Sequence, residues 1–393
     1  MKRILIPITA CFLFLSASAQ DRRTADNVSF VYDAFFQYCF DNREFGQSEN
    51  LFMNSETINL ARLAPSVGLA VDSGDGVTHS VMAGADIMRD MGKGSEYGHE
   101  FTLWYSLGLF RDDFNFTGHA GMFPRRFSVF GSESVPPRGT GRVPTVFMSD
   151  KARVYDSNME GLLLRFFSSR AYVEAGLDWM GMLGSGRRER FQIFTYGSFF
   201  LAGGFDLGWI ATLYHFANTL EYRGVVDNVL LSPFISWTCI SGDLRYDAKL
   251  SWLQGIHQDR IIHTGLELAP GVLLSQDLKW KKVSVSGDAY YGTGQMPYYY
   301  CLDAGGNMYG SDLYFGCPFY RIFKQSEYWK TPGFYGRAEV YWNPLVLDLA
   351  DIRLGAVAHF NGGGFCGWQQ KLSVVFDLDS SRWKRIKRTD AGY

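Results

Sequence analysis

The side chains of this sequence that could do chemistry are its seven histidines, its six cysteines and a set of regularly spaced charged residues. No Gly-x-Ser-x-Gly elbow, HExxH motif or phosphate-binding loop is present, and His99-Glu100 lacks the second histidine of a zinc protease. Catalysis by an isolated residue such as His119 or His359 would require a hydroxyl or carboxylate partner within hydrogen-bond distance. We therefore predict no catalytic residue, no metal site, no cofactor and no enzymatic activity.

The cysteines give no clear disulfide framework. Cys11 lies in an N-terminal apolar segment, and the remaining number is odd, with no spacing that resembles a zinc site: Cys39, Cys239, Cys301, Cys317 and Cys366. Cys301 and Cys317 fall in one predicted loop. In an oxidising compartment they either form a disulfide or remain two separate thiols.

The charged residues are positioned by a strict alternation, seen most clearly in LRYDAKLSWL, which begins at Leu244. Leu250 and Trp252 share the parity of Leu244, whereas Asp247 and Lys249 fall on the other parity. Successive side chains of a β-strand point to opposite faces, so this segment has one apolar face and one charged face. A strand of this kind fits a sheet with lipid on one side and water on the other.

The alternation recurs along most of the chain and predicts an all-β protein. Aromatic residues make up 16% of the sequence and there are 43 glycines, which suits many strands, tight turns and aromatic rings at two membrane interfaces. No apolar run beyond the N-terminus approaches the roughly 20 residues of a membrane-spanning helix. We predict a single transmembrane antiparallel up-and-down β-barrel of about 16 strands, with 14 or 18 as neighbouring even numbers. Pro233 and Pro270 fall within strands and are expected at bulges or register breaks.

The lengths of the links between strands support this topology. Links after even-numbered strands are short, as in Ser73–Val77 and Asp112–Asp113, whereas links after odd-numbered strands are longer. Bacterial barrels place short turns in the periplasm and long loops outside the cell. The two longest loops, residues 124–160 and 293–333, are therefore predicted to be extracellular.

Both ends of the chain lie outside the predicted barrel, which covers residues 20–379. Lys2 and Arg3, an apolar core and Ala17-Ser18-Ala19 form a secretory signal peptide over residues 1–19. Residues 380–393 add a basic tail that we expect to be a solvated periplasmic segment. The expected location is the outer membrane of a Gram-negative cell.

Charged side chains on the strands must point into the lumen, because a charge facing lipid near the midplane costs about 2–4 kcal/mol. The predicted polar wall of the lumen consists of Asp33, Arg62, Asp86, Arg165, Glu174, Asp178, Arg245, Asp247, Lys249, Arg337, Glu339 and Arg353. Acidic and basic residues are mixed, so neither an anion pore nor a cation pore is indicated. The lumen is either a water-filled pore or one crossed by ion pairs and partly closed by a folded-in loop.

The loop at residues 293–333 is dense in aromatic residues, which include Tyr298, Tyr299, Tyr300, Tyr314 and Tyr320. Exposed rings outside the cell would mark a surface that binds a glycan or a protein partner. Alternatively, the rings pack among themselves and constrict the mouth of the barrel, and we favour this interpretation.

Several segments resemble those of uncharacterised, porin-like outer-membrane β-barrels of Bacteroidetes-type bacteria. They are Asp41-Asn42-Arg43-Glu44-Phe45, Leu63-Ala64-Pro65-Ser66-Val67-Gly68-Leu69, Gly121-Met122-Phe123-Pro124-Arg125-Arg126 and Gln295-Met296-Pro297-Tyr298, together with a signal that ends in Ala-Gln. The resemblance covers most of the mature chain and implies a barrel in the outer membrane. It implies no catalytic residue.

The sequence therefore favours a porin-like passive channel for small hydrophilic solutes. A closed barrel that binds a glycan or protein through its aromatic loops, or has a structural role, is the main alternative, and an outer-membrane hydrolase is less favoured. Expected partners are outer-membrane lipid, lipopolysaccharide and the barrel-assembly machinery. With a net charge of -2, the chain has no basic surface for nucleic acid.

Overall fold

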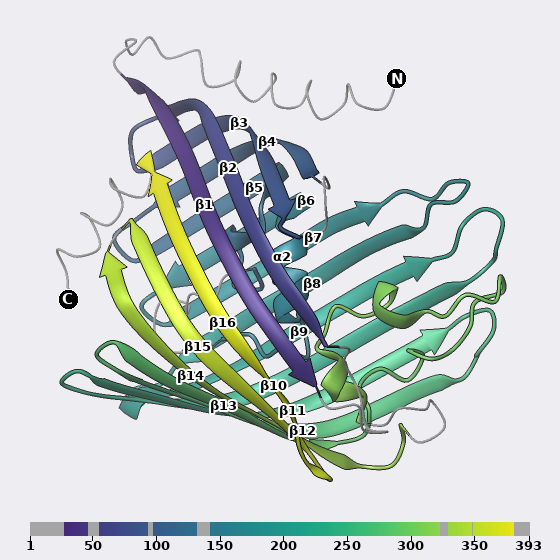
Figure 1. The fold of residues 1–393 in the computed structure, drawn as a ribbon. Coiled ribbons are helices and arrows are strands. Elements are labelled where there is room, and N and C mark those ends of the chain that lie inside the picture. Colours follow the sequence, from purple (N-terminus) through teal and green to yellow (C-terminus); the bar gives the residue numbers. More distant parts are fainter. Residues whose placement is uncertain are drawn as a thin grey trace.

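The computed structural model describes residues 27–45, 55–92, 97–131, 142–322, 329–347 and 349–380. Sixteen antiparallel strands form one closed barrel in which each strand pairs with its sequence neighbours and β1 pairs with β16 (Figure 1). The predicted fold and strand number are confirmed. Closure leaves no sheet edge, which matters because hydrocarbon offers no hydrogen-bond partner to an unpaired backbone group.

The strands have the following bounds: β1 Val28–Phe45, β2 Glu56–Asp72, β3 Val77–Asp90, β4 Tyr97–Phe110, β5 Phe114–Pro124, β6 Asn158–Ser168, β7 Ala171–Gly181, β8 Glu189–Phe200, β9 Phe205–Ala217, β10 Val225–Ser241, β11 Leu244–Asp259, β12 Leu266–Trp280, β13 Val283–Gly292, β14 Gly333–Leu347, β15 Ala350–Asn361 and β16 Gly364–Asp379. Within the described ranges, one short α-helix, α2 (Asp150–Tyr155), and four 3-10 segments accompany them: η2 Arg125–Phe127, η3 Ala202–Gly204, η4 Gly310–Asp312 and η5 Pro318–Arg321. The described residues include no helix long and apolar enough to span a membrane.

The two ends of the barrel differ in their connections. At one end, here called the short-turn end, hairpins close tightly, as where the Ser73 amide donates to the Val77 carbonyl at 2.9 Å. At the other, the long-loop end, lie the links at 125–157 and 293–332, which we call the inward loop and the aromatic loop. The link between β14 and β15 is shorter than expected, because a bulge between Trp342 and Leu345 carries β14 on past Pro344.

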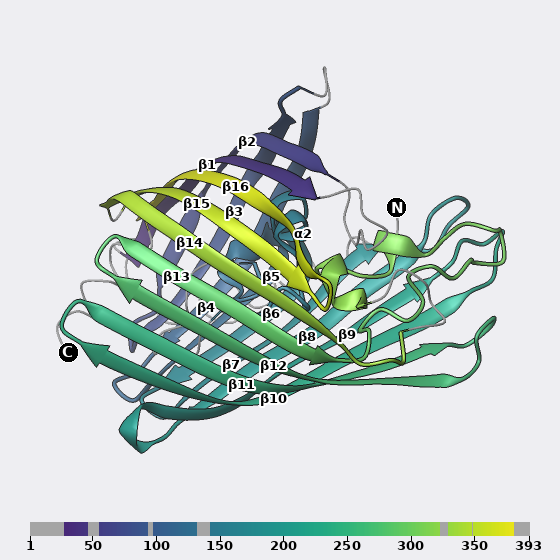
Figure 2. The same cartoon turned by 60° about the horizontal axis from the view of Figure 1, so that its bottom comes forward.

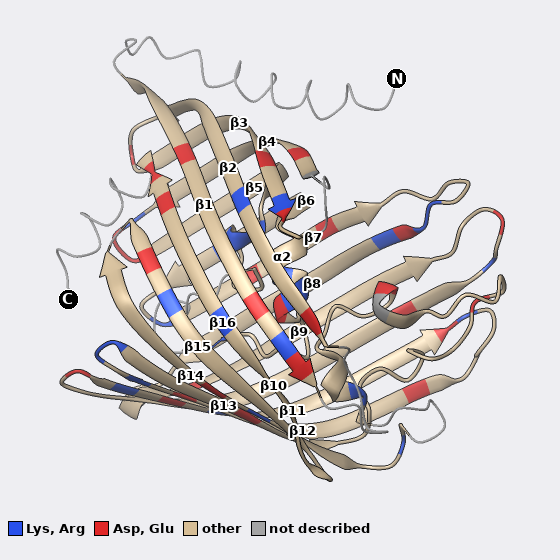
Figure 3. Ribbon diagram, in the orientation of Figure 1, with Lys and Arg blue, Asp and Glu red and all other residues tan. Residues whose placement is uncertain are grey.

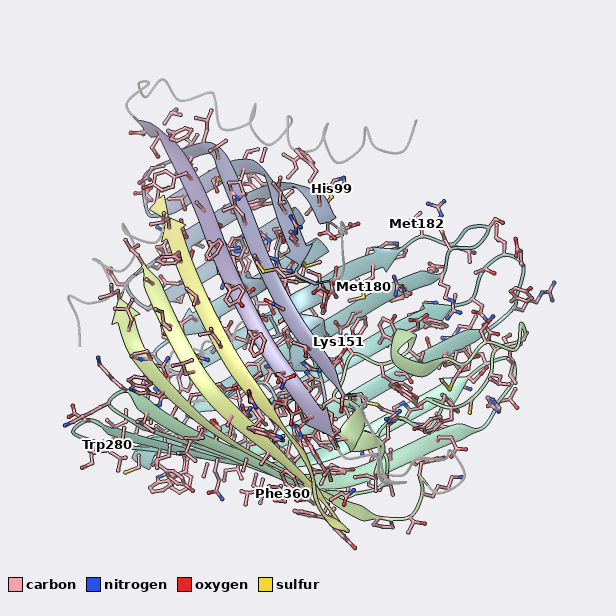
Figure 4. The ribbon with its side chains drawn as sticks, in the orientation of Figure 1. His99, Lys151, Met180, Met182, Trp280 and Phe360 are labelled. Atoms are coloured by element: carbon pink, nitrogen blue, oxygen red, sulfur yellow. The ribbon has the colours of Figure 1, made fainter. Side chains whose placement is uncertain are left out.

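The strand faces follow the predicted alternation. On β11, Leu250 and Trp252 are 50% and 48% exposed on the outer face, whereas Asp247 and Lys249 are buried on the inner face. Charged positions on the strands are interspersed with uncharged ones, and Trp280 and Phe360 lie at the outer surface (Figures 3 and 4). Pro233 and Pro270 correct one expectation, because both lie in strands that keep one register.

The lumen is filled unevenly. Phe130 of the inward loop packs on Phe194 with ring centroids 4.5 Å apart, and Tyr320 of the aromatic loop packs on Tyr335 at 4.9 Å. These rings belong to one apolar cluster, in which Phe194 lies on β8 and Tyr335 on β14. The two loops therefore close part of the lumen from within.

The two-sided wall gives a test on a single strand. Leu250→Arg places a charge at mid-strand on the outer face and should lower the free energy of unfolding by about 2–4 kcal/mol. Leu244→Arg, on the same face but at the first residue of β11, should cost only about 0–1 kcal/mol because a charge near the interface stays hydrated. Urea unfolding in lipid vesicles measures both values, and equal losses would contradict the assigned membrane face.

Candidate functional site: the lumen and its inward loop

The described parts of the inward loop, residues 125–131 and 142–157, include η2 and α2 and lie within the ring of strands (Figures 1 and 2). Its helix begins at a local signal, because the Ser149 side chain accepts a hydrogen bond from the Ala152 amide at 3.1 Å. Asp150 is the first residue of the helix and points to the wall. These parts of the loop thus fold into the barrel.

Asp150 joins the inward loop to the last strands of the wall. Its Oδ2 accepts hydrogen bonds from Arg337 Nη2 on β14 at 2.8 Å and from Lys371 Nζ on β16 at 2.7 Å. Burial by itself would raise the pKa of Asp150, but Arg337 and Lys371 hold that pKa well below its usual range. The carboxylate is therefore charged at any physiological pH.

Arg142 makes a second junction with the wall. Its guanidinium pairs with Glu339 on β14 and with Asp288 on β13, the latter at 3.1 Å, and lies 3.6 Å from Asp277 on β12. Lys249 Nζ on β11 donates to the Arg142 carbonyl at 2.8 Å. One loop residue therefore contacts four adjacent strands.

The opposite side of the loop contacts the first strands. Arg126 pairs with Asp33 on β1, and Lys151 Nζ lies 2.7 Å from Glu56 Oε2 on β2. The Tyr155 hydroxyl donates to Asp90 on β3 at 2.7 Å. Because ionic contacts hold it on both sides, the loop is a fixed constriction and not a free lid.

A cavity of about 1750 Å³ remains between the inward loop and the wall formed by β1–β6 and β14–β16. It extends from the short-turn end, where Asp112 and Asp379 line it, to the level of Asp41 and Asp150. Its volume exceeds the roughly 300–1,000 Å³ of an ordinary ligand pocket. The cavity lies off-centre, because it is lined by β1–β6 and β14–β16, whereas ring pairs such as Phe130–Phe194 occupy the lumen elsewhere.

The structure places the twelve charged residues predicted for the lumen wall on eight strands. Nine of them contact the inward loop through their side chains: Asp33, Arg62, Asp86, Arg165, Glu174, Asp178, Lys249, Arg337 and Glu339. Arg245 and Asp247 pair with each other at 2.7 Å, and Arg353 lies 3.5 Å from Asp351. The loop's own charges, Arg142 and Asp150, were not among the residues predicted from the sequence. The helix cap at Ser149 was the available signal for Asp150.

A serine and a histidine meet on the cavity wall, as an outer-membrane hydrolase would require. Ser106 Oγ lies 2.8 Å from His119 Nδ1, and Arg165 Nη2 lies 3.3 Å from His119 Nε2. Because arginine can only donate, the Arg165 contact favours the tautomer of the neutral ring that carries its proton on Nδ1, facing the serine. A general base needs the reverse arrangement, so this pair is not set up to activate Ser106. The described residues hold no cluster of three or more potential metal ligands.

The tyrosines of the aromatic loop face the barrel. Tyr298 and Tyr320 are 3% and 0% exposed, and the Tyr298 amide donates a hydrogen bond to the Tyr314 hydroxyl at 3.0 Å. The Tyr299 ring lies 5.2 Å from Tyr300 and 3.9 Å from the Arg321 guanidinium. The loop therefore presents few of these rings to a partner.

Cys301 and Cys317 form no disulfide in the structure. Cys317 is buried with its sulfur 4.0 Å from the Tyr335 hydroxyl, and burial raises the pKa of its thiol. Of the two alternatives for these cysteines, the structure has separate thiols.

No family model and no curated protein matches this sequence. Among solved structures, the chain is similar to outer-membrane OmpT of Vibrio cholerae, with a TM-score of 0.50, 8% identity and coverage of 91% of this chain and 100% of that one. OccAB3 of Acinetobacter baumannii gives a TM-score of 0.48 at 7% identity, covering 91% and 100% of the two chains. At such identities the likeness concerns the fold alone. The chain therefore has the fold of a bacterial outer-membrane β-barrel of porin-like architecture.

Removing the Asp150 charge should release the inward loop. Asp150→Asn leaves Arg337 and Lys371 short of a counter-charge in a buried setting, so we expect a loss of about 3–5 kcal/mol and proteolytic cleavage within residues 125–157. Asp156→Asn is the matched control, because Asp156 lies in the same loop but is 34% exposed and its partner Arg125 keeps Asp178. The control should cost about 0–1 kcal/mol. If Asp150→Asn and Asp156→Asn were equally resistant to protease, the Asp150 charge would not be what holds the loop in place.

The lowered pKa of Asp150 also predicts how docking depends on pH. A carboxylate with a depressed pKa contributes its full stabilisation above the ordinary value of 3.8 and loses it only as pH falls through the depressed pKa. Hydrogen exchange of the loop, corrected for intrinsic rates, should therefore be equally slow at pH 8 and pH 5. Release of the loop between those values would show that another group controls docking.

Proposed function

We propose that this protein is a passive channel for small hydrophilic solutes and that the off-centre cavity is the route they take. The observation that carries the proposal is the cavity itself, about 1750 Å³ in volume. Charged, hydroxyl and aromatic side chains line it from its mouth at the short-turn end, which we take to be periplasmic, to the inward loop. A barrel of 16 strands is wide enough for an aqueous path unless something fills it. Here the two loops leave a cavity beside β1–β6 and β14–β16.

The inward loop limits the size of solute that can pass. Its side chains contact β1–β3 on one side and β11–β14 and β16 on the other, so the path narrows at this level. Arg126 contributes directly, because it extends from η2 to Asp33 and its guanidinium lies 4.6 Å from the Phe35 ring. Small solutes therefore fit this geometry better than folded or bulky ones.

The alternatives have less support. A closed barrel that binds partners through exposed rings needs an aromatic surface, whereas Tyr298 and Tyr320 are buried. A hydrolase needs a base beside a nucleophile, and His119 presents a proton to Ser106. We also infer that the barrel is of Bacteroidetes type, that a signal peptide precedes it and that the basic tail follows it in the periplasm; these inferences rest on the sequence, and residues 1–26 and 381–393 lie outside the described ranges.

Conductance of the purified, refolded protein in planar lipid bilayers tests the proposal. We expect steady open-channel current, which Arg126→Ala should increase because it removes a side chain that crosses the cavity. Arg260→Ala is the matched control, since Arg260 pairs with Asp227 at the long-loop end and does not line the cavity. Its current should equal that of the wild type.

Two outcomes would overturn the proposal. Absence of current from a barrel that circular dichroism shows to be folded, in the wild type and Arg126→Ala alike, would favour the closed-barrel alternative. If Arg126→Ala and Arg260→Ala increased the current equally, the current would not depend on a residue that lines the cavity, and the cavity would not be the route.

A further inference from the structure

The charge along the cavity is unevenly distributed. At its periplasmic mouth, six carboxylates line the cavity, belonging to Asp72, Asp112, Asp113, Asp351, Asp377 and Asp379. Two basic residues, Arg111 and Arg353, line the same region. Figure 3 shows the acidic positions on β15 and β16 at this end. The mouth therefore carries a net charge of about four negative units at neutral pH.

Closure of the barrel brings these groups together from distant parts of the sequence. The β1–β16 ladder pairs Asp33 with Asp379 and Phe35 with Asp377, and the β15–β16 ladder sets Asp351 against Val375. Asp72 ends β2, and the β4–β5 turn adds Asp112 and Asp113. Because these residues share one rim, their fields add within the mouth.

Deeper in the cavity, opposite charges largely cancel. Arg62 pairs with Asp86 at 3.2 Å, and Arg126 pairs with Asp33. Lys371 is held by Asp150, as described above. Arg165 stands opposite Glu174 in the β6–β7 ladder. Four carboxylates and six basic residues line this inner part: Asp33, Asp41, Asp86 and Asp150, and Arg62, Arg125, Arg126, Arg153, Arg165 and Lys371. Arg125 is also paired with Asp156 and Asp178, which do not line the cavity. The excess of negative charge therefore lies at the mouth.

We propose that the cavity selects cations over anions, with the mouth carboxylates as the residues that determine specificity. This inference rests on the proposed channel function and names the charge class of its solutes. The effect is a field acting along the cavity and requires no fixed ion site. Low-dielectric walls concentrate such a field, as rings of carboxylates do in cation channels.

The reversal potential across a KCl gradient measures the selectivity. Four net charges acting over about 10 Å with one Debye length of screening predict a K⁺ over Cl⁻ preference on the order of fivefold at about 0.1 M salt. The preference should fall towards unity at about 1 M salt, where the Debye length is about 3 Å. Asp112→Asn with Asp113→Asn should reduce it to roughly half, since half the net charge is lost.

Asp75→Asn is the matched control. Asp75 lies in the adjacent β2–β3 turn at the same end but does not line the cavity, and asparagine tolerates its φ of 49°. Selectivity that falls in the double variant and holds in Asp75→Asn supports the proposal. Anion preference, or equal effects in the two variants, overturns it while leaving the channel in place.

A second measurement works without current, so that failure of the channel and failure of the selectivity are distinguishable. Cys39 on β1 lines the cavity and forms no disulfide. A cationic methanethiosulfonate should modify Cys39 faster than an anionic one of similar size, after each rate is divided by that of a thiol in solution. Mass spectrometry of the Cys39 peptide gives the rates.

The rate ratio should fall in the Asp112→Asn, Asp113→Asn variant and hold in Asp75→Asn. If the folded protein passes no current but shows this pattern, the channel proposal fails and the charge preference of the cavity stands. Equal rates for the two reagents in the wild type at low salt would overturn the preference.

Discussion

A charge cannot face hydrocarbon, and the rest of this structure follows from that constraint. The strands send their ionic side chains inward, where many would lie buried without a counter-charge. The inward loop supplies the missing partners, with Asp150 between Arg337 and Lys371 and with Arg142 among the carboxylates of β12–β14. The wall and the loop therefore stabilise each other electrostatically. Removing one partner costs more than replacing the whole pair would, because the remaining charge stays buried.

The inward loop and the aromatic loop both fill part of the lumen. The aromatic loop packs Tyr320 against Tyr335 on β14, and Phe130 of the inward loop packs against Phe194 on β8. The first strands and the last ones keep polar inner faces, and the cavity lies against them. The packed rings hold the two loops rigidly, and the cavity beside them leaves room for water. A lumen packed evenly with side chains would leave no such room.

The fold could be predicted from the sequence because its signal is local. Each strand shows its two faces within ten or so residues, as Leu250 and Lys249 do, and link lengths alone give the topology. The inward loop could not be predicted, since Asp150 is separated from Arg337 by 187 positions and from Lys371 by 221. A loop's length says nothing about whether it folds outward or inward. Whether Cys301 and Cys317 form a disulfide could not be predicted either, because sequence spacing does not determine whether two thiols are close in space.

The contacts of the inward loop also bear on the order of events during assembly. Arg126 reaches Asp33 on the first strand, and Asp150 reaches Lys371 on the last, so one loop bridges the seam where the chain's two ends join. A sheet that is still open holds these partners apart. The loop can complete its ion pairs only after β1 has met β16, and a barrel that stalls before closure keeps unpaired charges in its interior. Loop docking is therefore a late step that makes a closed barrel harder to reopen.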